Sequence, residues 1–164
     1  MATRLPPRFV RIGVSGTITG VGLGLAALLI AQLFAGFASP LGLFFGGVFP
    51  LALATAVAAA GLLIWRCGLT AEQSVHVGFW WAIGTGVSTV TGFALVIFEA
   101  SGGVTLADPE IIVVGNSASG GLGGLIVGWY DARRLALAAE RERERQQLAD
   151  EREKLALINR IVRH

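Results

Sequence analysis

The sequence predicts an all-α membrane protein: four transmembrane helices followed by a long cytosolic helix that forms a dimeric coiled-coil linker. Three observations predict this fold. Of the 164 residues 54% are hydrophobic, and residues 12–130 contain uncharged runs long enough to cross a bilayer four times. All 13 Lys and Arg fall on the same side of that four-span path. Beyond Trp129 there is neither Gly nor Pro, and strong helix formers dominate.

The first two spans share residues 12–65, which contain no charged side chain. Because roughly 20 apolar residues cross the hydrocarbon core of a bilayer, this stretch must cross twice. Ser39 followed by Pro40 disfavours continuation of a helix. We therefore expect spans near residues 12–35 and 41–65. The first apolar run is too long for the core of a cleavable signal peptide, the alternative interpretation of an N-terminal span.

Capping residues and prolines mark where the helices start or bend. The third and fourth spans occupy the remaining uncharged runs, residues 73–98 and 111–130. Thr70 and Gln73 fit a capping box, in which each side chain satisfies an otherwise unpaired backbone N–H at the start of the third helix. Asp108 fits the cap of the fourth helix, with Pro109 at its first position. Pro50 is expected to kink the second span.

The distribution of charge predicts the orientation in the membrane. Lys and Arg are retained on the cytoplasmic side, and the two loops opposite the termini contain none. The segment from Glu99 to Glu110 carries only carboxylates. Aromatic residues that favour the bilayer boundary lie on the basic side: Trp65, Trp80, Trp81, Trp129 and Tyr130. We expect a multi-pass protein of the plasma membrane with both termini in the cytoplasm.

The chain divides into three parts: a cytosolic N-terminal tail (residues 1–11), a four-helix transmembrane domain (12–130) and a cytosolic helix (131–164). In the last part, Leu148, Leu155 and Val162 recur every seven residues, which is typical of a coiled-coil seam. An isolated helix would expose the apolar side chains near its end, whereas a second copy would cover them. We therefore expect a parallel homodimer. The apolar cluster comprises Leu155, Leu157, Ile158, Ile161 and Val162.

Small residues at four-residue spacing predict close helix contacts within the membrane. Three stripes occur: Gly16, Gly20 and Gly24; Gly84, Ser88 and Gly92; and Gly120, Gly124 and Gly128. Such stripes let helix backbones approach closely, either within one chain, between two copies, or both.

Polar residues within the spans offer few candidate sites. Asn116, Ser117 and Ser119 are expected to bond across helices rather than to bind a ligand. Cys67 and His76 make a poor metal site without further Cys or His residues nearby. No ionisable group lies deep inside a span, which disfavours ion-coupled transport, and no catalytic or nucleotide-binding motif indicates a complete enzyme. We expect no nucleic-acid partner.

The end of the chain resembles a known family. The segment Leu157-Ile158-Asn159-Arg160-Ile161-Val162-Arg163-His164 resembles the opening of the phosphoacceptor box of archaeal sensor histidine kinases, in which an acidic or amide residue follows the histidine. The glycine-rich fourth span, continuing through Tyr130-Asp131-Ala132-Arg133 into an Arg/Glu-rich helix, is similar to the four-transmembrane region that precedes the kinase core in haloarchaeal members. The resemblance covers the whole chain, but only these two stretches are specific.

This resemblance implies that residues 12–130 form a sensor domain and residues 131–164 a signalling helix that ends at the phosphoacceptor box. His164 would be the phosphoacceptor and so the catalytic residue; the alternative is an exposed terminal histidine without a role. This sequence implies no cofactor or metal of its own, because ATP and magnesium belong to a kinase domain that it lacks. The chain alone is therefore expected to be inactive.

The expected function is that of the membrane input module of a two-component histidine kinase, which passes a conformational signal through the cytosolic helix to the phosphoacceptor histidine. Its expected partners are the lipid bilayer, a second copy of the chain, and a response regulator or kinase catalytic domain. Two alternatives remain open: a non-enzymatic scaffold whose coiled tail recruits a partner, and, with less support, a subunit of a channel or transporter.

Overall fold

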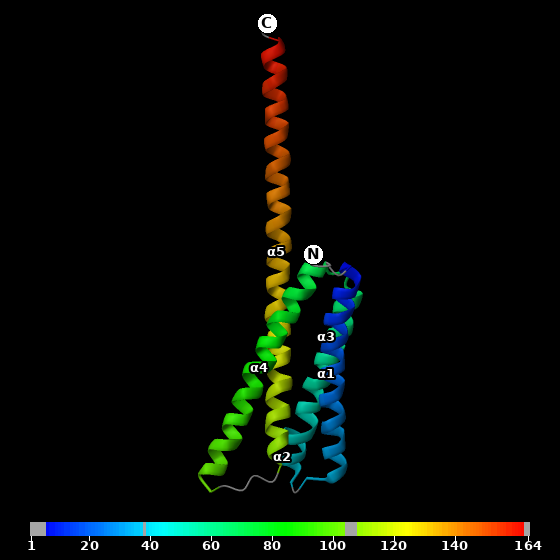
Figure 1. Ribbon diagram of the computed structural model, residues 1–164, viewed down its shortest axis with the longest axis vertical. Helices are drawn as coiled ribbons and strands as arrows, with labels where there is room; N and C mark the ends of the chain where they lie inside the picture. Colours follow the sequence, from blue (N-terminus) through cyan, green and yellow to red (C-terminus); the bar gives the residue numbers. More distant parts are fainter. Residues whose placement is uncertain (1–5, 38, 104–107, 163–164) are drawn as a thin grey trace, which may run out of the picture.

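A computed structural model of the chain describes residues 6–37, 39–103 and 108–162, without the side chains of Pro7, Asp150 and residues 153–162. Over this range the fold is all-α, and Figure 1 shows a bundle from which the last helix projects as a single rod. The elements are α1 (Pro7–Ala35), α2 (Pro40–Gly42), the π-helical η1 (Leu43–Val48), α3 (Phe49–Arg66), α4 (Ala71–Ser101) and α5 (Pro109–Val162).

Four helical stretches are long and apolar enough to cross a membrane. The prediction of a multi-pass, all-α membrane protein with four spans is confirmed at this level, and the break between the first two spans lies at Ser39 and Pro40, as expected. The orientation relative to the two sides of the membrane stays a prediction. The four stretches are Arg8–Ala35, Pro40–Arg66, Ala71–Ser101 and, within α5, Pro109–Ala149.

Local sequence determines where α4 and α5 begin. The Thr70 hydroxyl accepts a hydrogen bond from the backbone N–H of Gln73 at 3.2 Å, and the Gln73 side chain accepts one from the backbone N–H of Thr70 at 2.9 Å. The predicted capping box is thus confirmed. Helix α5 begins at Pro109, also as predicted. At this helix start, the backbone carbonyl of Asp108 accepts from the N–H of Ile111 at 3.2 Å.

The backbone of the second span changes geometry directly before Pro50. Residues Leu43–Val48 form a π-helix, and the N–H of Phe49 donates to the carbonyl of Phe44, five residues earlier. Proline has no N–H, so it cannot donate to the carbonyl four residues before it, and the preceding turn is free to widen. The Pro50 ring lies against α5, where an added Cβ at Gly115 would be 3.5 Å from its Cγ. The kink expected at Pro50 stays a prediction; what the structure shows here is the π-helical segment directly before it.

The four long stretches form two pairs. Helix α4 lies against α5 and α1 against α3, while α3–α5 and α1–α4 contacts join the pairs. Helix α5 continues beyond the bundle without interruption as far as Val162 (Figure 1). In the described residues the fourth span and the rod are one helix, because no proline separates them, and no separate long helix follows the span.

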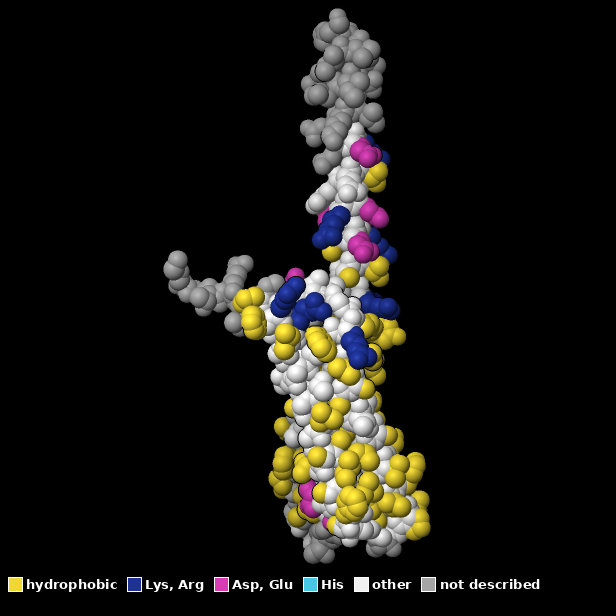
Figure 2. Space-filling model, turned by 90° about the vertical axis from the view of Figure 1, so that its right-hand side faces the viewer, with side chains coloured by type: hydrophobic (Ala, Val, Ile, Leu, Met, Phe, Trp, Pro, Cys, Tyr) yellow, Lys and Arg dark blue, Asp and Glu magenta, His cyan; other side chains and the backbone are white. Residues whose placement is uncertain are grey.

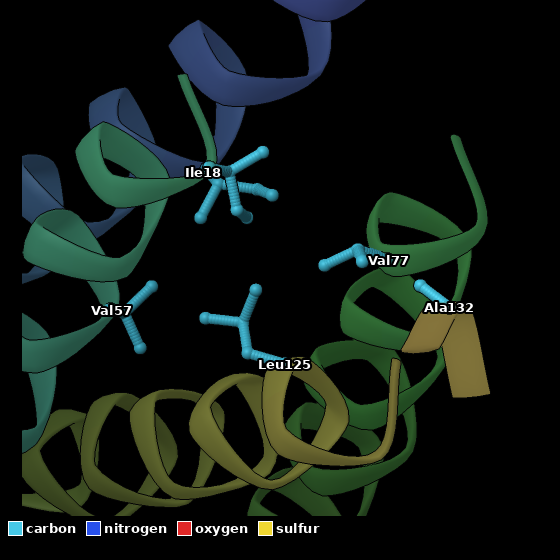
Figure 3. Close-up of a cluster of buried hydrophobic side chains, with 6 residues drawn as sticks. Ile18, Val57, Val77, Leu125 and Ala132 are labelled. Atoms are coloured by element: carbon cyan, nitrogen blue, oxygen red, sulfur yellow. The ribbon is translucent and has the colours of Figure 1, made fainter. Parts of the chain in front are cut away.

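Side chains from all four long helices meet in an apolar cluster, and a second cluster joins α1, α3 and α5 around Leu29 and Ala118. Figure 3 shows Ile18 of α1, Val57 of α3, Val77 of α4 and Leu125 of α5 converging, with Ala132 of α5 beside Val77. Each is 5% exposed or less. Within a bilayer, lipid tails are as apolar as these side chains, so close van der Waals packing holds such a core together.

Large apolar side chains cover the outside of the bundle, as yellow surface in Figure 2 shows. Phe34 is 89% exposed and Phe98 72%. An apolar surface this extensive exceeds what soluble monomers normally present to water. Its natural solvent is lipid.

The two ends of the bundle differ in charge. We call the end where α5 leaves the bundle the rod end, and the opposite end the acidic end; Figure 2 shows Lys and Arg side chains gathered where the rod leaves the bundle. At the rod end, the Arg11 guanidinium donates to the backbone carbonyl of Trp65 at 3.3 Å, which joins α1 to α3. At the acidic end, the Gln32 amide donates to the Glu110 carboxylate at 2.9 Å, which joins α1 to α5.

Candidate functional site

Three polar side chains connect α4 to α5 at the rod end. One carboxylate oxygen of Asp131, on α5, lies 2.8 Å from Nε2 of His76 and accepts a hydrogen bond from Nε1 of Trp80 at 3.0 Å. His76 and Trp80 are one turn apart on α4, so both face the same point of α5. We call these three residues the clasp. Asp131 is the first charged residue after the fourth uncharged run, and His76 lies in the second turn of α4, so the clasp holds α5 near the rod end of the bundle.

Below the clasp, the backbones of α4 and α5 touch. We call Gly84 on α4 together with Gly120, Gly124 and Gly128 on α5 the glycine seam. Gly84 packs against Gly120 and Gly124, and Gly128 packs against Val77 and Trp80. A Cβ added at Gly124 would lie 2.9 Å from the Cα of Trp81, and one added at Gly128 would lie 2.9 Å from the Cα of Val77. Atoms of the neighbouring backbone cannot move aside as a flexible side chain can. Glycine is therefore required at these positions.

A third contact lies further toward the acidic end. The hydroxyls of Thr89 on α4 and Ser117 on α5 are 2.6 Å apart, and either can donate to the other. The hydroxyl that does not donate across the interface can donate to a carbonyl of its own helix, that of Thr85 or of Val113. Nearby, an added Cβ at Gly92 would be 3.1 Å from the Cα of Val113. Clasp, seam and hydroxyl pair together hold α4 to α5 over several helical turns.

The predicted polar contacts are borne out only in part. Ser117 bonds across the helix interface to Thr89, as expected. Asn116 and Ser119 instead donate to carbonyls of their own helix, those of Ile112 and Gly115. A side chain one or two positions along a helix points in a different direction, so neighbouring polar residues need not share a partner.

The three small-residue stripes have different surroundings. Those of α4 and α5 face each other, with Ser88 packed against Gly120. The stripe of Gly16, Gly20 and Gly24 on α1 contacts nothing within the described chain, since a Cβ at any of these positions would meet no atom within 4 Å. The close contact of α1 with α3 is made elsewhere, at Gly22 against the backbone of Ala58.

Candidate chemical sites are few in the part of the chain that the structure describes. No group of three His, Cys, Asp or Glu residues that could hold a metal occurs there. Cys67 is an exposed free thiol, and His76 is engaged by Asp131 rather than by a metal site with Cys67. The candidate phosphoacceptor His164 lies outside the described residues, as do the side chains of the apolar cluster near the end of the rod.

The clasp was missed by reasoning from the sequence, which considered His76 only as a possible metal ligand and disfavoured that role. Two signals pointed to it. His76 and Trp80 share one face of α4, and Asp131 is the first charged residue after the fourth span. Their pairing spans 55 positions of sequence, so it follows only from the way in which α4 and α5 lie together.

Comparison of the chain with protein-family models, with curated proteins and with solved structures finds no match in any of the three. No family is thereby identified. The functional argument therefore depends on the geometry of α4 and α5 and on the residues of the chain itself.

Proposed function

We propose that this chain is the membrane input module of a sensor histidine kinase, oriented with both termini in the cytoplasm. The observation that carries the proposal is the single helix α5, which runs from the fourth span into the rod without a break. Its far end leads into the octet that resembles the archaeal phosphoacceptor box. The positive-inside distribution of Lys and Arg supports the orientation.

In this proposal, the clasp and the glycine seam couple the bundle to the rod. The seam sets the separation of α4 and α5, and the clasp sets how α5 is rotated and placed near the rod end. A change in how α4 packs against α1 would therefore displace α5 as well. Since α5 is one helix, the rod transmits that displacement along its length toward His164. A parallel second copy would cover the apolar residues near the end of the rod.

The chemical output is phosphoryl transfer to an imidazole. A neutral imidazole nitrogen is a nucleophile near neutral pH, so His164 is proposed to accept the γ-phosphoryl group of ATP held by a separate kinase domain. A bond forms between the imidazole nitrogen and phosphorus, the bond to the bridging oxygen breaks, ADP leaves, and the imidazole proton passes to solvent. The residues of this chain supply the acceptor and its positioning.

Two experiments test the proposal. The coding sequence after the His164 codon is expected to encode an acidic or amide residue and then an ATP-binding domain. A stop codon directly after His164 would contradict the proposal and favour a scaffold that recruits a partner through its tail.

The protein encoded by the entire gene, incubated in membranes with γ-labelled ATP, is expected to carry an acid-labile phosphate. Replacement His164→Gln should abolish this label, because it removes the nucleophile. Replacement His76→Gln, at the other histidine among these 164 residues, should leave the label on His164. Labelling that persists in His164→Gln would refute the assignment of the phosphoacceptor.

A further inference from the structure

An apolar groove lies between α3 and α5 at the rod end. Its volume is about 480 Å³, within the range of roughly 300–1,000 Å³ that is usual for small-molecule pockets. Its walls include Leu63 and Ile64 of α3 and Leu122 and Ile126 of α5. Leu63 is 56% exposed and Ile126 52%. The groove therefore opens to the outside of the bundle, where the bilayer lies.

One cation stands among the residues that line this groove. The guanidinium carbon of Arg133 lies 5.6 Å from the centre of the Trp129 ring, a cation–π contact between residues one turn apart on α5. Trp129, Tyr130 and Arg133 all line the groove, and no acidic residue does. Among the described residues, one ion pair occurs, between His76 and Asp131. Arg133 therefore has no carboxylate within 4.0 Å in this part of the chain.

The groove thus offers an apolar surface and a cation, and a phospholipid has a counterpart for each. Its walls suit a hydrocarbon chain, and the Arg133 guanidinium suits a phosphate, to which it can donate several hydrogen bonds. Trp and Tyr prefer the level of the lipid headgroups, so Trp129 and Tyr130 indicate that Arg133 lies at that level too. A phospholipid with a net negative charge matches both parts.

We propose that this groove binds one anionic phospholipid, with a hydrocarbon chain against Leu63 and Ile126 and the headgroup phosphate on Arg133. The site goes beyond the proposed role in phosphoryl transfer, and it requires only that the helices lie in a membrane. It differs from the general solvation of the bundle by lipid, because it selects the headgroup by charge.

Native mass spectrometry of the purified protein in detergent tests this site. Phosphatidylglycerol and phosphatidylcholine with identical chains are added at increasing concentrations, and the lipid-bound fraction is measured. The wild type is expected to bind phosphatidylglycerol about tenfold more tightly, the factor expected from one charge-assisted contact. Replacement Arg133→Gln should remove this preference. Replacement Arg134→Gln, which makes the same change of charge outside the groove, should keep it.

A second pair of variants tests the hydrocarbon half of the site. Replacement Leu63→Trp fills the groove and should weaken binding of phosphatidylglycerol, whereas Leu62→Trp, on the adjacent position outside the groove, should not. Excess glycerol phosphate, which has the headgroup chemistry without a chain, should fail to displace the lipid.

Three outcomes would overturn the proposal: equal binding of the two lipids by the wild type, equal losses in Arg133→Gln and Arg134→Gln, or a lipid-free dimer that ignores added phosphatidylglycerol because a second copy covers the groove.

Discussion

Replacement Gly124→Leu is expected to disrupt the α4–α5 contact and to destabilise the protein by about 3 kcal/mol or more. A Cβ at this position would lie 2.9 Å from the Cα of Trp81 and closer still to the carbonyl oxygen of Trp80. Overpacking a well-packed interior costs about 1–3 kcal/mol even where side chains can yield, and here the obstacle is backbone. The midpoint of thermal unfolding in detergent should fall by roughly 10 °C.

The adjacent glycine provides the matched control for this prediction. Gly123 is exposed on the outside of α5, and a Cβ added there would meet no atom within 4 Å. Replacement Gly123→Leu should change the stability by less than about 1 kcal/mol, since it affects only the intrinsic helix preference. Similar losses of thermal stability in the two variants would show that the glycine seam is not the contact that joins these helices.

Replacement Asp131→Leu is expected to loosen the contact of α5 with α4 near the rod end. It removes the carboxylate that His76 and Trp80 share. Because the side chains of His76 and Asp131 are 40% and 37% exposed, water can replace part of the interaction, and the cost in stability should be only about 1 kcal/mol. The effect on the position of the rod should be larger than the effect on stability. Leu148 lies about 25 Å along the helix axis from Asp131, so a tilt of about 10° would move it by about 4 Å.

Pulsed electron paramagnetic resonance can measure this displacement. Spin labels are placed on the exposed positions Val75 and Leu148, both changed to Cys in a Cys67→Ser background. The distance distribution should broaden or shift by several ångströms in Asp131→Leu and remain close to that of the parent in Asp131→Asn, which keeps one acceptor oxygen. Identical distributions in all three proteins would show that the clasp does not position the rod.

Helix boundaries in this chain could be predicted because they depend on neighbouring residues. The capping box at Thr70 and Gln73 and the start at Pro109 each require only a few consecutive positions. The continuity of α5 follows from the same kind of information, as no Gly or Pro occurs after Trp129. The division of the chain at residue 130 therefore marks a change in composition within one helix and not the end of an element.

Helix pairing could not be predicted in the same way. Stripes of small residues occur on three spans, and composition alone does not tell which of them face a neighbour. The stripe at Gly16, Gly20 and Gly24 faces away from the other helices, while Gly22 makes the contact with α3. Which face of a helix meets its neighbour depends on the rotation and crossing of both helices, and these follow from the packing of the entire bundle.

The central claim, that one continuous helix links the membrane bundle to the end of the rod, has a direct test. Spin labels at Ile126→Cys and Leu148→Cys, in a Cys67→Ser background, flank the exit of α5 from the bundle; both positions are more than half exposed. The labelled protein is diluted with unlabelled protein so that distances within one chain dominate. A straight helix of 22 steps places the labels about 33 Å apart on nearly the same face. A narrow distribution near that value is expected, whereas a broad or clearly shorter one would reveal a hinge and contradict the account.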